Sequence, residues 1–116
     1  MVPGMATLSI RLDLAPEVRV GPGKIRLLES VAEHGSISGA GRALGMSYRR
    51  AWLLLDEMNR GFPDPVIQAQ PGGRSGGGAV LTPFGNHLVA SYRAIEREAA
   101  KVAARHLAGL RPVATT

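Results

Sequence analysis

Two short helical segments meet at Gly45, and this junction constrains the fold more than any other feature of the chain. In the second segment, apolar side chains recur one helical turn apart, at Ala51, Leu54, Leu55 and Met58. This spacing is typical of a helix with one buried face, and the Ser47 hydroxyl can cap its first turn. The first segment begins with the hydroxyl side chains of Ser36 and Ser38. Two helices joined by a tight glycine turn predict a helix-turn-helix unit at about residues 36–60.

A further helix and a strand precede this unit. Residues 24–34 carry apolar side chains at helical spacing, and Gly35 is expected to end that helix in the left-handed conformation. Residues 23–62 thus predict three helices. Upstream, residues 7–14 alternate strictly between polar and apolar side chains, the apolar ones being Leu8, Ile10, Leu12 and Leu14. The alternation predicts a half-buried N-terminal strand.

A hairpin and a long helix follow the three helices. Residues 66–82 are typical of two short strands joined by a glycine-rich tip. Thr82 and Pro83 then supply a hydroxyl cap and a proline at the first helical position, and the helix continues over 83–108. We therefore expect residues 1–116 to form a single, mainly α domain with a small β-hairpin. The fold that we expect is a winged helix-turn-helix with an N-terminal strand and a long C-terminal dimerisation helix.

The composition favours an anionic partner and excludes several classes of protein. Lys and Arg number 14 against 9 Asp and Glu, for a net charge of +5, and there is no cysteine. Thiolate zinc sites, disulfide frameworks and cysteine nucleophiles are therefore excluded. No apolar run approaches the roughly 18–20 residues that span a bilayer, so we expect no membrane contact and a cytoplasmic protein.

The helix after Gly45 carries the residues best placed to read DNA. Arg49 lies opposite its apolar stripe and Arg50 flanks it, and an arginine fork matches the O6 and N7 acceptors of guanine. A solvated helix face is the alternative interpretation of these two arginines. Leu53 also lies on the outer face, where it can contact a thymine methyl group or a partner chain.

Two aromatic residues of the same helix lie at the edge of the apolar stripe. Tyr48 and Trp52 are one turn apart, so we expect both to pack in the core against the preceding helix or the hairpin. The alternative for Tyr48 is a hydrogen bond from its hydroxyl to a DNA phosphate.

The hairpin tip is rich in glycine and carries Arg74 and Ser75. A phosphate-binding loop of a nucleotide enzyme would need a Lys and a Ser or Thr at fixed positions, or a strand followed by a helix, and both are missing here. We expect instead a wing that lays Arg74 along the DNA backbone or into the minor groove, with a purely solvated linker as the alternative.

The last helix carries apolar side chains at alternating steps of four and three residues, which is a heptad pattern. The residues expected to form a dimer seam are Leu88, Tyr92, Ile95, Ala99 and Val102. The alternative is that this face packs only on its own domain, which Leu88 and Tyr92 can do.

An enzyme is not expected. The three histidines, His34, His87 and His106, lie far apart along the chain, and no paired carboxylates form a recognisable catalytic motif.

Five stretches of the chain resemble the ModE family of molybdate-responsive transcriptional regulators. They are GKIRLLE at 23–29, GSIS at 35–38, GMSYRRAW at 45–52, DEMN at 56–59, and PGGRSGGGAVLT at 71–82 followed by Phe84 and Gly85. The resemblance covers about residues 7–108, and LysR-type regulators share a looser version of the same fold. It implies a homodimer that binds a palindromic operator upstream of molybdate-uptake genes.

The residues and partners that we expect to act follow from these arguments. The DNA-binding residues are Ser36, Ser38, Ser47, Tyr48, Arg49, Arg50, Leu53, Arg74 and Ser75. No cofactor and no metal are expected, and molybdate is an effector to test although the family's usual molybdate-binding domains are absent from the sequence. Two alternatives remain open: a molybdate-binding protein that uses backbone N–H groups, and a subunit that pairs with a separate sensor.

Overall fold

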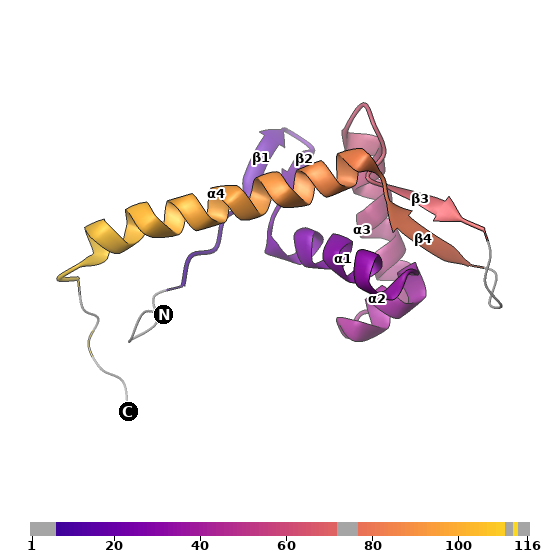
Figure 1. Ribbon diagram of the computed structural model, residues 1–116, viewed down its shortest axis with the longest axis horizontal. Coiled ribbons are helices and arrows are strands. Elements are labelled where there is room, and N and C mark those ends of the chain that lie inside the picture. Colours follow the sequence, from indigo (N-terminus) through magenta and orange to yellow (C-terminus); the bar gives the residue numbers. More distant parts are fainter. Residues whose placement is uncertain (1–6, 72–76, 111–112, 114–116) are drawn as a thin grey trace.

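The computed structural model describes residues 7–71, 77–110 and 113. Figure 1 shows a cluster of short helices with a β-hairpin at one end and a long helix that runs across the cluster and out beyond it. In chain order the elements are β1 (Leu12–Ala15), β2 (Val18–Val20), α1 (Pro22–His34), α2 (Ile37–Ala43), α3 (Tyr48–Gly61), β3 (Ile67–Gln70), β4 (Gly78–Leu81) and α4 (Pro83–Leu107). The mainly α winged helix-turn-helix fold is thereby confirmed.

Helices α1, α2 and α3 surround one apolar core. Its fully buried side chains come from all three helices and from the strands beside them, and include Val20, Ile25, Leu28, Ala40, Ala51, Leu55 and Val66. A Cβ atom on Gly41 of α2 would lie 3.3 Å from the Ala51 Cβ atom of α3, so glycine permits the close approach of the two helices.

The helix ends follow the local signals in the sequence. Gly35 and Gly45 adopt left-handed φ angles of 73° and 71°, as their positions after α1 and α2 predict. The hydroxyl oxygens of Ser36, Ser47 and Thr82 each accept a backbone N–H bond in the first turn of α2, α3 and α4. The helix predicted from residue 24 begins two residues earlier, because Pro22 is suited to a first helical turn.

The wing is an antiparallel pair of strands attached to the helical cluster. β3 and β4 pair in register from Ile67 and Leu81 to Gln70 and Gly78. The Ala79 N–H of β4 donates to the Gly35 carbonyl at the end of α1, at 2.9 Å. This hydrogen bond attaches the wing to the helical cluster. The predicted contact residues Arg74 and Ser75 lie outside the described residues.

The predicted single N-terminal strand over residues 7–14 is wrong. Only residues 12–15 are extended in a strand, and a turn at Pro16 and Glu17 folds the chain back into β2, which was not predicted. Leu8 and Leu14 are exposed, and of the four apolar side chains only Ile10 and Leu12 pack, partly buried, against the core. Val20 of β2 enters the core instead and is fully buried.

The first half of α4 packs on its own domain. Leu88 and Tyr92 are buried there, and the Tyr92 hydroxyl donates to the Ile10 carbonyl at 2.7 Å. Burial and this hydrogen bond commit Leu88 and Tyr92 to the intramolecular core, so placing them in a dimer seam was wrong. None of the helices in the described part of the chain is long and apolar enough to cross a membrane.

An ion pair joins α4 to α1. The Arg93 guanidinium donates two hydrogen bonds to the Glu29 carboxylate, at 3.0 and 2.8 Å, and a third to Glu96. Hydrogen bonding to Arg93 lowers the pKa of Glu29 below its ordinary value of 4.5, and the same contacts raise the pKa of Arg93. Two parallel hydrogen bonds define a direction as well as a distance, so this pair fixes how α4 crosses α1.

We expect Gly85→Ala to destabilise the domain by about 1–3 kcal/mol, because the new Cβ atom would collide with the Val66 carbonyl oxygen. Urea unfolding followed by circular dichroism measures the change. Gly23→Ala is the matched control: nothing lies within 4 Å of its Cβ position, and alanine favours a helix. Equal stability of the two variants would contradict the close approach at Gly85.

We expect Glu29→Gln to lower the free energy of unfolding by roughly 1 kcal/mol at neutral pH. The lowered pKa of Glu29 means that the ion pair contributes above pH 4.5 and is lost as the pH falls through that lowered value. The two proteins should therefore converge in stability in acid. Glu33→Gln, at an exposed site on the same helix, should behave as the parent. A Glu29→Gln deficit that persists undiminished in acid would refute the ion-pair explanation.

Candidate nucleic-acid interface

Helix α3 presents a free outer face that carries Arg49 and Leu53. Both side chains are exposed, on the side opposite the buried Ala51, Leu55 and Met58. The Ser47 hydroxyl accepts from the Arg50 N–H at 3.1 Å and fixes the first turn that displays them. Farther along the face, Arg60 pairs with Asp56 at 2.9 Å, so the uncompensated positive charge is at the N-terminal end of α3.

One flank of α3 is held against α1. Lys24 of α1 forms an ion pair with Glu57 at 3.1 Å, and its ammonium also donates to the Arg19 carbonyl. Arg50 is exposed on this flank, and it lines a shallow hollow of about 320 Å³ together with Ser47, Arg49, Leu53, Leu54 and Glu57. Because Lys24 already pairs with Glu57, the acidic residue of the hollow is engaged and the arginines dominate its charge.

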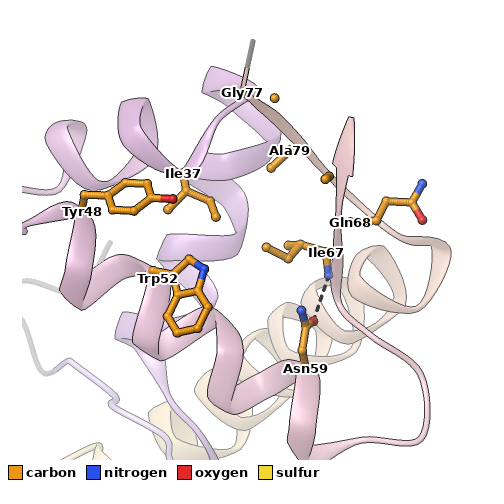
Figure 2. Close-up of a pocket in the computed structure, with 10 residues that line it drawn as sticks. Ile37, Tyr48, Trp52, Asn59, Ile67, Gln68, Gly77 and Ala79 are labelled. Carbon is orange, nitrogen blue, oxygen red and sulfur yellow. Dashed lines mark hydrogen bonds between the residues drawn. The ribbon is translucent and has the colours of Figure 1, made fainter. Parts of the chain in front are cut away.

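The other flank of α3 faces the wing. Tyr48 is 57% exposed and Trp52 is 44% exposed, so the prediction that they pack in the core is wrong. Between them and the strands lies a groove of about 340 Å³, which Figure 2 shows with the two rings on one side and β3 and β4 on the other. The wing stands far enough from α3 to leave the rings uncovered, which periodicity along one helix cannot reveal.

Asn59 holds the wing at this distance from α3. Its side-chain oxygen accepts the backbone N–H groups of Val66 and Ile67, at 2.8 and 3.3 Å. These bonds tie the last turn of α3 to Val66 and to the first residue of β3, and one of them appears as the dashed line in Figure 2. The sequence signal for this role was weak, since an asparagine in a helix usually faces solvent.

The serines predicted to contact DNA hold local structure. The Ser36 hydroxyl accepts the Gly39 N–H at 2.9 Å, and the Ser38 hydroxyl accepts from Arg42 at 3.2 Å. Ser47, Tyr48, Arg49, Arg50 and Leu53 are brought together on or beside the exposed start of α3. Within the described residues there is no group of three His, Asp or Glu side chains that could hold a metal ion.

The family model described as "Bacterial regulatory helix-turn-helix protein, lysR family" matches residues 23–86, from α1 to the start of α4. The chain belongs to this family. The matched segment includes α3, the wing and the close contact at Gly85, so the geometry above is that of the family's helix-turn-helix domain.

Curated relatives match most of the chain. The chain is 45% identical over 94 residues to the molybdenum-pterin-binding protein MopA of Rhodobacter capsulatus, covering 81% of this chain and 35% of the relative. It is 39% identical over 94 residues to the molybdenum transport protein ModE of Azotobacter vinelandii, covering 81% and 34%. With the Escherichia coli (strain K12) dual regulator ModE it shares 37% over 87 residues, covering 75% and 33%. The resemblance to ModE is thus confirmed, and the chain spans about a third of the length of these relatives.

We expect Asn59→Ala to lower stability by about 1–3 kcal/mol, because the substitution removes the acceptor of two backbone N–H groups at the start of the wing. Hydrogen exchange of the Val66 and Ile67 amides should accelerate more than exchange in α1. Asn86→Ala on the exposed side of α4 is the control and should change neither quantity. Unchanged amide protection in Asn59→Ala would contradict the anchoring role.

Proposed function

We propose that the chain is a sequence-specific, double-stranded DNA-binding regulator of transcription, acting on molybdate transport or other molybdenum-related genes. The observation that carries the proposal is the exposed start of α3, where Arg49, Arg50 and Leu53 protrude from a helix held rigidly by its opposite face. Membership in a family of bacterial regulatory helix-turn-helix proteins supports it. Such a regulator works where the DNA is, in the cytoplasm, and carries out no catalysis.

In this proposal α3 lies in the major groove with its first turns against the base edges. Arg49 donates to guanine, Leu53 contacts a thymine methyl group, and Arg50 approaches the phosphates from the flank. The wing lies over the adjacent minor groove, where Arg74 and Ser75 are our proposed contacts. Ser36 and Ser38 contribute by holding the start of α2 in place beside the DNA backbone.

We propose further that two copies pair through the distal half of α4. Ile95 and Val102 are 43% and 47% exposed, and with Ala99 they lie on one face of a helix that extends beyond the domain (Figure 1). Pairing would bury this apolar face. A two-fold dimer would bind a palindromic operator with its half-sites one helical turn, or a multiple of it, apart.

The link to molybdenum rests on the names of the relatives. Several are called transcriptional regulator ModE, and two are called molybdenum-pterin-binding proteins. The chain matches about a third of each, so we assign the shared part to DNA binding with no resident cofactor and treat molybdate as an effector. Calorimetry with molybdate tests the alternative that the chain itself binds the oxyanion.

The proposal is tested with labelled duplexes from regions upstream of molybdate-uptake genes and with a scrambled duplex. We expect Arg49→Ala to reduce promoter affinity about 10- to 100-fold, since a bidentate arginine contributes roughly 1–3 kcal/mol of discrimination, and to affect the scrambled duplex far less. Arg97→Ala, an exposed charge on α4, is the matched control and should weaken both duplexes slightly and alike. Equal losses for Arg49→Ala on both duplexes would exclude base reading by Arg49, and failure of the parent to bind either duplex would exclude the function.

A further inference from the structure

The groove between α3 and the wing contains two aromatic rings that are about half exposed to solvent. The chain has five aromatic residues. Three of them are packed: Tyr92 is buried, and Phe62 contacts Phe84 with ring centroids 5.1 Å apart. Tyr48 and Trp52 are the exposed aromatics of the described residues, and both line the same groove. Two large exposed rings side by side in so small a domain indicate a binding surface.

The width of the groove is set by hydrogen bonds within the domain. Its far wall is β3 and β4, and the two hydrogen bonds accepted by Asn59 set how far that wall stands from α3. The indole nitrogen of Trp52 is turned toward β3, and the Tyr48 ring lies across Ile37 at the start of α2 (Figure 2). A strand of another molecule could therefore pass between α3 and the wing with the rings on one side.

The chemistry of the lining suits an anionic chain with apolar parts. All ten of its described lining residues are uncharged. No carboxylate is therefore present to repel an anion. The indole N–H and the phenol O–H are donors set among apolar surfaces, which matches alternating phosphate oxygens and sugar rings.

We infer that this groove seats the sugar-phosphate backbone of one DNA strand, with Trp52 and Tyr48 as its contacts. The inference rests on the proposed function, because a helix in the major groove and a wing over the next minor groove must straddle the strand that separates them. The deoxyribose lies against the rings, and the indole N–H donates to a phosphate oxygen. Trp52 thus acts as a clamp that is independent of base sequence.

Trp52 reports on its own environment, because it is the only tryptophan in the chain. Its fluorescence emission is recorded while the full chain is titrated with the promoter duplex and with the scrambled duplex. We expect emission to change on saturation with either duplex, since the backbone is common to both. Unchanged emission while a labelled duplex is bound would overturn the inference and leave DNA binding intact.

Variants separate a backbone contact from base reading. We expect Trp52→Ala to lower affinity for both duplexes by the same factor, roughly tenfold, which is the effect of losing one hydrogen bond to a charged group. The slope of log affinity against log salt should stay unchanged, because a neutral side chain releases no counterions. Trp52→Phe, which keeps a ring without the donor, should fall between Trp52→Ala and the parent.

Leu14→Ala removes an exposed apolar side chain far from the groove and is the matched control, with no expected change in affinity. A Trp52→Ala loss confined to the promoter duplex would overturn the backbone contact in favour of base reading. A response of Trp52 emission to molybdate without DNA would assign the groove to the oxyanion and overturn it as well. If the parent binds no duplex at all, the proposed function fails first.

Discussion

The backbone of Val66 is the point on which the arrangement of the surface depends. Its N–H donates to Asn59 of α3, its carbonyl accepts the Thr82 N–H at 3.0 Å, and Gly85 of α4 packs directly on that carbonyl. One fully buried residue thus joins α3, the wing and α4. The backbone N–H and C=O of Val66 are both hydrogen-bonded away from water, so moving α3 or the start of α4 would break a buried hydrogen bond.

The contacts around Val66 determine the positions of both the wing and α4. At the wing, the position of β3 sets the width of the groove beside Tyr48 and Trp52. It also sets how far the groove lies from Arg49 on the outer face of α3. Toward the other end, Gly85 fixes where α4 starts, and the Arg93 pair with Glu29 fixes its direction across α1. The distal half of α4 is therefore held at a defined angle to α3, which the proposed dimer would need for its two α3 helices to reach two half-sites.

Signals that act within a few residues made much of this fold predictable from the sequence. Ser47, Thr82 and Gly45 determine helix ends through contacts in a single turn, and all three behave as predicted. Contacts between distant elements were not predictable in the same way. A heptad pattern is identical whether Leu88 and Tyr92 meet a partner or their own domain. The exposure of Trp52 depends on how far away the wing stands, which is set by Asn59. The alternation at residues 7–14 does not reveal that only Ile10 and Leu12 of its apolar side meet the core.

We propose that α3 reads guanine edges in the major groove, once in each of two copies of the chain. Methylation interference on a promoter duplex tests it most directly, because a methyl group on guanine N7 blocks the acceptor that an arginine fork would use. We expect binding to be abolished by N7 methylation at guanines in two half-sites about 10–10.5 base pairs apart, or a multiple of that distance. Binding that tolerates N7 methylation throughout the duplex would contradict it.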